Sequence, residues 1–432
     1  MDNKMTYNLI KKAERTIKMA YQSLAKLFYK DTSSERFERN EQLAQERFNA
    51  ESTFKTGIDS DHGELFLAVP RELSVINEKI LRVERLLSAR LRQLPPVAHS
   101  AMLRSLVIDE VVSTNELEGV HSSRKQINDL LTGSVRTAAS PHGKSTGRRF
   151  SELTRMYLGL SDPNVRRPET AKEIREIYDQ LMAGEQLGEN KLDGVLFRAH
   201  PVEIIGQGGK TLHEGVMPEE KIIELLDKMI ALVDSPDVPE MYSAIIAHFV
   251  FEFIHPFYDG NGRTGRYLLA LYLSKPLSML TTLSLSRTIA ENKSAYYVAF
   301  KDTEHPLNHG ELTMFVMKML EFIRVAQERL LDELDVKLGQ FGSMGERFEK
   351  LSATAKLGKA GREIVYMLGQ FDLFALFPQA SLEEIAQHVG LGTQQTRKHL
   401  SKLEEMGLVE VSRKRPLLFE LSDVARSELG LG

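Results

Sequence analysis

The feature that most constrains the fold is an almost wholly apolar run at residues 242–254, YSAIIAHFVFEFI. A run of this length without a polar face predicts a helix that is buried on all sides. Pro256 has no amide hydrogen, so the chain must leave the helix just after His255. Leucines at helical spacing return after Arg263, which predicts a second helix and a glycine-rich loop between the two. The expected fold class is mainly α.

The loop between these helices has the composition of a phosphate site. Gly260, Asn261 and Gly262 directly precede the second helix, where free amide groups and the positive end of the helix dipole favour an anion. Arg263 and Arg266 are spaced i, i+3, so both guanidinium groups can face one ligand. Two such groups beside an anion site suit a polyphosphate.

Two further residues of the loop add chemistry to this site. His255 can act as a general base near neutral pH, and Asp259 is the kind of oxygen ligand that Mg²⁺ needs when it bridges phosphates. Together they fit attack of a hydroxyl group on a phosphorus of a nucleoside triphosphate. Each residue alone has an ordinary alternative, since a histidine at a helix end and a glycine turn are often only structural.

The residues from His255 to Arg266 follow the pattern HPFxDGNGRxxR, which resembles the signature of Fic-domain proteins at every position. The resemblance implies a helical core at about 150–325 and transfer of AMP from ATP, the co-substrate, to a Ser, Thr or Tyr hydroxyl of a target protein. It also implies Mg²⁺ as cofactor. Relatives that transfer phosphate carry Lys where this chain has Gly262, so Gly262 favours nucleotidyl transfer.

The resemblance also implies a role for each residue of the site. His255 would deprotonate the hydroxyl, Asp259 would hold Mg²⁺, and Phe257 would anchor the loop in the core. Arg266 would reach the γ-phosphate, and the full phosphate-binding set would be Gly260, Asn261, Gly262, Arg263 and Arg266. Tyr296 or Tyr297 would stack on adenine, the alternative being that both tyrosines are simply packed.

Residues 201–216 consist of two short extended runs around a Gly-rich turn, which predicts a β-hairpin. The hairpin lies where the Fic family has a flap that pairs with the backbone of a target protein, a form of strand addition. The resemblance therefore implies a protein substrate bound at 201–216. The alternative is a surface hairpin without a role.

A second motif lies more than a hundred residues upstream. Thr114 and Glu118 are spaced i, i+4 in the last turn of a helix expected at about 101–118, and Gly119 is suited to end it. Glutamate is unfavourable at that end of the helix dipole, so a phosphate-site arginine is a natural partner, although an ordinary solvent-facing glutamate is the alternative. The pattern TxxxEG resembles the inhibitory motif of one Fic class. There the glutamate pairs with the second signature arginine, here Arg266, and misplaces ATP, which implies an autoinhibited chain.

The C-terminal part predicts a different unit. Helices at 381–390 and 393–407, the first with Ser381 as N-cap, precede two strands at 408–421, which is the order of a winged helix-turn-helix domain. Residues 391–415 hold six basic and three acidic residues, a net charge of +3. DNA contacts are expected from Thr393, Gln394, Gln395, Arg397, Lys398, Arg413, Lys414 and Arg415. The alternative is a domain used for protein contacts or dimerisation.

These patterns predict five segments. They are an N-terminal helical extension at 1–65, a helical region with the inhibitory motif at 66–149, a Fic core at 150–330, a linker helix at 331–358 and a winged helix-turn-helix domain at 359–432. Within them, residues 56–70 have the composition of a linker and residues 134–148 that of a loop.

Composition narrows the remaining choices. The absence of cysteine excludes disulfides, thiol nucleophiles and zinc–thiolate sites. No segment has the length of a membrane span or the apolar core of a signal peptide, so a cytoplasmic protein without a membrane partner is expected. Two other functions stay open beside AMP transfer: a nucleotide-sensing DNA-binding regulator, and removal of AMP with Glu118 positioning a water molecule. Transfer of another group, UMP or phosphocholine, also stays open. A homodimer also stays open.

Overall fold

The computed structural model describes residues 21–132, 150–185, 187–205, 211–351 and 357–431. The described chain is mainly helical with three small antiparallel sheets, as the sequence predicts. The loop expected at 134–148 lies outside the described residues, as does the first part of the N-terminal helical extension. Contacts divide the chain into two compact units, Met1–Lys79 with Tyr297–Leu320, and Ile80–Tyr296 with Glu321–Gly432.

The described part of the first unit begins with a helical pair and a hairpin. The elements are α2 (Leu24–Lys30), α3 (Arg36–Phe48), β1 (Thr53–Ser60) and β2 (Gly63–Ala68), followed much later by η2 (Pro306–Asn308). The linker expected at 56–70 is therefore wrong. Its glycines lie in the hairpin, Gly57 next to a register shift and Gly63 at the turn, both with positive φ. Ile58 is fully buried, so these strands pack as part of the unit.

Three helices contribute to both units. They are α4 (Arg71–Leu91), α15 (Lys293–Thr303) and α16 (Thr313–Lys350). The helix α16 is continuous across 330/331, where the sequence suggested a boundary, and across the glycines of 339–346. It continues because Leu334, Met344 and Phe348 keep a buried apolar stripe at helical spacing through that stretch.

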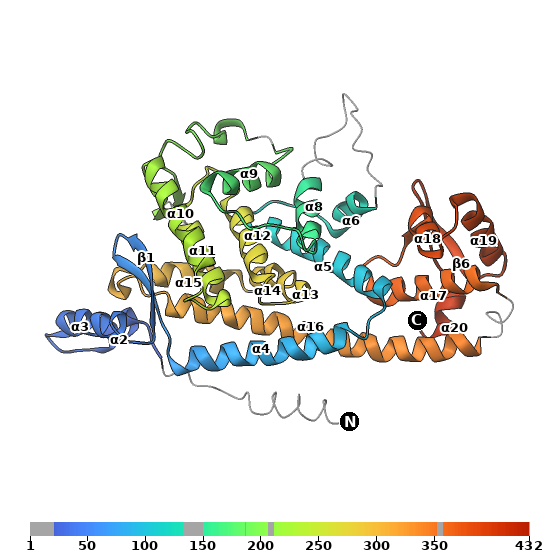
Figure 1. Cartoon of the computed structure of the whole chain (residues 1–432), viewed down its shortest axis with the longest axis horizontal. Coiled ribbons are helices and arrows are strands. Elements are labelled where there is room, and N and C mark those ends of the chain that lie inside the picture. Colours follow the sequence, from blue (N-terminus) through green and yellow to red (C-terminus); the bar gives the residue numbers. More distant parts are fainter. Residues whose placement is uncertain (1–20, 133–149, 186, 206–210, 352–356, 432) are drawn as a thin grey trace. The chain divides into compact units, whose positions relative to one another are not determined.

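The second unit holds the helical core that positions the site. Its elements are α5 (Pro96–Leu117), α6 (Arg124–Leu131), α8 (Ser151–Gly159), α9 (Ala171–Leu181), η1 (Gly188–Asn190), β3 (Glu203–Ile205), β4 (Thr211–Glu214), α10 (Glu219–Asp234), α11 (Glu240–Ile254), α12 (Asn261–Leu273), α13 (Met279–Thr282) and α14 (Leu285–Glu291). The predicted apolar helix is α11, buried almost throughout, and it packs against α12, whose residues are all buried (Figure 1). The predicted flap hairpin is β3–β4.

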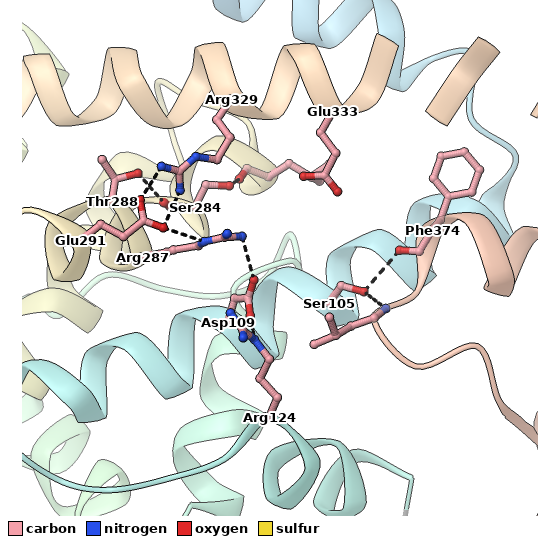
Figure 2. A network of polar contacts seen from close by, with 12 residues as sticks. Ser105, Asp109, Arg124, Ser284, Arg287, Thr288, Glu291, Arg329, Glu333 and Phe374 are labelled. Atoms are coloured by element: carbon pink, nitrogen blue, oxygen red, sulfur yellow. Dashed lines mark hydrogen bonds and ion pairs between the residues drawn. The ribbon is translucent and has the colours of Figure 1, made fainter. Parts of the chain in front are cut away.

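The helix α5 carries the upstream motif at its C-terminal end. It starts earlier than the sequence suggested, because Pro96 is favourable at the first helical position. It ends as expected, with Gly119 at a φ of 70°. Polar contacts fix its middle: Asp109 accepts hydrogen bonds from Arg124 at 2.5 Å and from Arg287 at 3.2 Å (Figure 2). One turn earlier, Ser105 bonds the backbone around Phe374 (Figure 2).

The C-terminal part of this unit has the predicted order of helices and strands. It comprises α17 (Lys359–Phe374), β5 (Ala380–Ser381), α18 (Leu382–Val389), α19 (Thr393–Glu405), β6 (Val409–Lys414), β7 (Leu417–Leu421) and α20 (Asp423–Leu429), with sheet order β5-β7-β6. Ser381 caps α18 in a capping box with Glu384, as its position suggested. Ion pairs join this part to the core, Glu384 to Arg104 of α5 and Arg413 to Asp129 of α6, both at 2.6 Å. Within the described ranges, no helix has both the length and the apolar character needed to cross a membrane.

Candidate active site

His255 ends α11 in a left-handed conformation, with φ 52° and ψ 59°. Its Nδ1 lies 3.3 Å from the carbonyl oxygen of Glu252. A carbonyl can only accept, so Nδ1 carries the hydrogen and Nε2 keeps a lone pair. Burial, and next the neighbouring His213, lower the pKa of His255 to about 4. The imidazole is therefore neutral at pH 7 and able to accept a proton.

Buried packing and side-chain hydrogen bonds hold the turn after His255 in place. Phe257 is fully buried and stacks on Tyr178 with ring centroids 3.7 Å apart. The side chain of Asn261 accepts from the backbone nitrogen of Phe257 at 2.9 Å and donates to its carbonyl oxygen at 2.7 Å. These two bonds hold the Asn261 side chain to the loop, and its backbone N–H lies at the start of α12, where helix amides are free for an anion.

Two glycines of the loop lie very close to side chains from other elements. Gly260 has a φ of 82°, and a Cβ there would lie 2.7 Å from Sδ of Met182. A Cβ on Gly262 would lie 2.1 Å from Oε1 of Glu118. The carboxylate of Glu118 therefore lies against the first turn of α12, where the sequence places an anion.

Arg266 is the centre of the contacts between α5 and α12. Its Nε donates to Thr114 Oγ1 at 2.8 Å, and its Nη2 donates to the Thr114 carbonyl oxygen at 3.1 Å and to Glu118 Oε1 at 2.6 Å. Burial alone would raise the pKa of Glu118, but the adjacent Arg266 outweighs it and holds that pKa below its usual value. The upstream glutamate is therefore ionised and paired with Arg266, as the resemblance implied.

Arg263 has an acidic partner that the sequence reasoning missed. Its Nη1 donates to Glu185 Oε1 at 2.6 Å, and the two side chains are only 3% and 8% exposed. Its Nη2 lies 3.7 Å from Asp259 Oδ1. Glu185 stands in the turn after α9, 78 residues before Arg263, and no spacing rule links the two.

Asp259 is the most exposed of the three acids beside the two arginines, with its side chain 48% exposed against 25% for Glu118 and 8% for Glu185. Its Oδ1 also accepts from the backbone nitrogen of Gly260 at 2.6 Å. Among the described residues, no cluster of three or more His, Cys, Asp or Glu side chains is arranged to hold a metal ion. One carboxylate still fits Mg²⁺, which commonly takes one or two protein carboxylates and completes its shell with phosphate oxygens and water.

The β3–β4 hairpin lies beside His255, the candidate base. The register pairs Glu203 with Glu214, and the imidazole of His213 donates from Nε2 to the carbonyl oxygen of Phe253 at 2.7 Å. The His213 and His255 ring centroids are 6.4 Å apart. The structure therefore brings β4 and the end of α11 together.

A buried arginine outside the signature, Arg198, bonds both to the end of the hairpin and to the end of α11. Arg198 is fully buried, and it donates to the carbonyl oxygens of His255 and Val216, each at 2.8 Å. It thereby ties the end of the flap to the start of the loop. A lone arginine at 198 gave the sequence analysis no signal, because its partners are backbone carbonyls that any residue carries.

The two candidate adenine-stacking tyrosines are placed differently. Tyr296 is 2% exposed, and its hydroxyl lies 2.8 Å from His248 Nε2. The stacking role is therefore wrong for Tyr296, which is packed in the core as the alternative held. Tyr297 is 44% exposed and belongs to the first unit.

Comparisons with known proteins agree with the fold and the loop. Residues 168–273 match the model of the Fic/DOC family, and the glycine loop of 255–266 lies within this match. The chain is 28% identical over 311 residues to "Protein adenylyltransferase fic-1" of Caenorhabditis elegans, an alignment that covers 66% of this chain and 55% of that protein. It is 29% identical over 126 residues to the protein of the same name from Caenorhabditis briggsae, covering 29% of this chain and 23% of that one. The chain thus spans about half of the first relative and a quarter of the second.

One solved structure gives the fold a direct parallel. A Fic family protein from Desulfovibrio desulfuricans G20 superposes with a TM-score of 0.50 at 18% identity. The match covers 82% of this chain and 97% of that chain. At this level of identity the likeness establishes the fold alone.

Proposed function

We propose that the protein transfers AMP from ATP to a Ser, Thr or Tyr hydroxyl of a target protein. The observation that carries the proposal is a neutral histidine at the end of α11, one loop away from two buried arginines at the start of α12. The relatives named as protein adenylyltransferases support the same reaction.

The chemistry assigns one task to each residue. His255 Nε2 takes the proton of the attacking hydroxyl, and the hydroxyl oxygen forms a bond to the α-phosphorus of ATP. The bond from that phosphorus to the β-phosphate breaks, and pyrophosphate leaves. Arg263, Arg266 and the backbone amides of α12 bind the phosphate charge. Asp259 would hold Mg²⁺, which would offset that charge.

In this proposal Glu118 keeps the chain inactive until it is released. Its carboxylate occupies the anion position against Gly262 and binds Arg266 at 2.6 Å. A triphosphate that needs Arg266 must displace it or bind with its α-phosphorus out of line. Misplacement of about 1 Å can lower a rate about 100-fold.

The protein substrate is proposed to pair with the flap at 201–216. The strands β3 and β4 form a separate two-stranded sheet. In strand addition, an extended segment of the target would pair with one edge of this sheet. The contact of His213 with Phe253 places β4 next to the candidate base.

The test compares the parent chain with Glu118→Gly and with Glu118→Gly/His255→Ala, using labelled ATP and Mg²⁺ and scoring label on the protein. The single variant should incorporate more AMP than the parent, and the double variant should incorporate none. Equal labelling of both variants would rule out His255 as the base. A parent chain that instead strips AMP from a modified protein, and loses this activity with Glu118, would favour AMP removal.

A second proposal concerns the C-terminal part, whose order of helices and strands is that of a winged helix-turn-helix domain. The first turns of α19 expose Gln394, Arg397 and Lys398, which suits DNA contact. Lys414 and Arg415 are exposed at the turn between β6 and β7. The remaining expected DNA contacts are Thr393 and Gln395, both exposed, and Arg413, which is paired with Asp129.

Titration with mixed duplex DNA at low salt tests this partner. Binding that weakens as salt rises, and that is lost in Arg397→Ala/Lys398→Ala, supports DNA contact. No binding at low salt would favour a role in protein contacts. A chain that binds DNA while its Glu118→Gly form transfers no AMP would favour the nucleotide-sensing regulator.

A further inference from the structure

We propose that Glu185 is a positioning residue for nucleotide binding: its carboxylate holds the Arg263 guanidinium so that one edge of the guanidinium is left for a phosphate group. This inference rests on the proposed function in taking ATP as the ligand. It concerns the affinity for the triphosphate and does not depend on the transfer step.

The turn that carries Glu185 is packed against the glycine loop. After α9 the chain bends at Gly184, which has a φ of 94°, and the backbone nitrogen of Glu185 donates to the carbonyl oxygen of Met182 at 2.9 Å. Met182 in turn lies so close to Gly260 that a Cβ there would come within 2.7 Å of its Sδ. The turn and the anion site therefore form one packed structure, and the backbone around Glu185 is held in place.

The pair of Glu185 and Arg263 is buried, unlike most ion pairs among the described residues. The distance from Nη1 to Oε1 is 2.6 Å, and the side chains are 3% and 8% exposed. Removing one partner of such a pair leaves an uncompensated charge away from water, so the pair holds its geometry firmly. Asp259, at 3.7 Å from Nη2, is beyond hydrogen-bond distance and cannot fix the guanidinium in the same way.

The Nε of Arg263 indicates which edge is left for a ligand. This nitrogen is buried and has no hydrogen-bond partner within the described part of the chain. Buried donors almost always have a partner, so an unpaired one marks the place of an acceptor from outside the chain. Nε and Nη2 together form one fork of the guanidinium, and such a fork suits two oxygens of a phosphate. Because Glu185 takes Nη1, this fork is the edge that stays available.

The opposite role, a second inhibitory carboxylate, would require Glu185 to occupy the anion position. Glu118 does so, since it lies against Gly262 in the first turn of α12. Glu185 instead takes one terminal nitrogen of Arg263 and leaves the Nε edge without a partner among the described residues. A positioning residue predicts weaker ATP binding when Glu185 is removed, whereas an inhibitory carboxylate predicts tighter ATP binding. Measuring ATP affinity therefore decides between the two roles.

The experiment uses the full chain with Glu118→Gly as the parent and adds Glu185→Ala, Glu185→Gln or Glu189→Ala. Glu189 is an exposed glutamate four residues further on and serves as the matched control. Calorimetry measures the dissociation constants of ATP with Mg²⁺ and of adenosine, which carries no phosphate. Thermal unfolding of each variant is measured alongside.

Glu185→Ala is expected to weaken ATP binding about 10- to 100-fold, the effect of losing a hydrogen bond to a charged group, with adenosine binding unchanged. Glu185→Gln keeps an oxygen for Nη1 and should weaken ATP binding less, and Glu189→Ala should match the parent. Unchanged or tighter ATP binding by Glu185→Ala would overturn the proposal, as would an equal loss for adenosine.

Should Glu185→Ala fail to fold, Glu185→Gln decides: weaker ATP binding with unchanged adenosine binding supports the proposal, and unchanged ATP binding overturns it. The proposed function fails separately, through absence of AMP transfer in the parent, and the binding data remain interpretable in that case.

Discussion

Replacing Thr114 by valine tests whether the contacts of Arg266 keep the site closed. Thr114 is fully buried, and its hydroxyl accepts from Arg266 Nε at 2.8 Å. Valine has nearly the same shape but no acceptor, so Nε would be left buried without a partner in the closed arrangement. A hydrogen bond to a charged group contributes about 1.5–3 kcal/mol, and its loss raises the energy of the closed arrangement by a similar amount.

In the open arrangement Arg266 turns to water or phosphate, so the open arrangement is not penalised in the same way. A change of 1.4 kcal/mol is tenfold in an equilibrium constant, so the open population should rise about 10- to 100-fold. The remaining bonds of Arg266, to the Thr114 carbonyl oxygen and to Glu118, keep the rise below that of Glu118→Gly.

The assay is the initial rate of label transfer from ATP onto the protein at fixed Mg²⁺. Thr114→Val should label faster than the parent, and Thr114→Ser, which keeps the hydroxyl, should label at the parent rate. In the Glu118→Gly background the same substitution should give no further rise, because no closed arrangement remains to be weakened. An unchanged rate in Thr114→Val, or an equal rise in both backgrounds, would refute the reasoning.

Three other predictions concern the loop. Because burial and His213 lower the pKa of His255 to about 4, transfer by Glu118→Gly should stay level on the acid side until the pH approaches about 4, and a decline centred near 6.5 would contradict this. His255 also makes the free energy of unfolding depend on pH, because the unfolded chain protonates this histidine near pH 6.5 and the folded chain only near pH 4. The contribution of His255 to stability is therefore complete above about pH 6.5 and is lost as the pH falls toward 4. Unfolding midpoints of the parent and of His255→Ala, compared across this pH range, measure the contribution. Phe257→Ala should lower the free energy of unfolding by about 3–5 kcal/mol, because the ring is fully buried on Tyr178; a loss under about 1 kcal/mol in urea unfolding would show that the ring is not an anchor.

The parts of the fold predicted from the sequence are those with local causes. The apolar run of α11 requires burial wherever it lies, and Pro256 ends it regardless of what packs nearby. Ser381 caps α18 through its own turn, and Gly119 ends α5 through its own φ. For the same reason the glycine loop could be placed between the two helices, at the start of α12, before any contact was known.

The parts that could not be predicted depend on partners far apart in the sequence. The glycines of 57–63 have the composition of a linker, and only the pairing of Thr53 with Ala68 makes them a hairpin. Tyr296 was an adenine-stacking candidate by position, and only its contact with His248 shows that it is packed. Glu185 has no motif around it, and its role as partner of Arg263 follows from how the turn after α9 packs on the loop.

The proposed function links nucleotide binding to inhibition through the charges of the site. Two guanidinium groups, Arg263 and Arg266, face three carboxylates, Glu118, Glu185 and Asp259, at distances of 2.6–3.7 Å. Of these acids only Glu118 both occupies the anion position and comes from another helix of the unit, α5. In the proposed function, any contact that shifts α5 should change ATP affinity, and by linkage ATP should change the affinity for that contact by the same factor. The ion pair of Arg104 with Glu384 joins α5 to α18, so a partner bound to the C-terminal part has a physical route to this equilibrium.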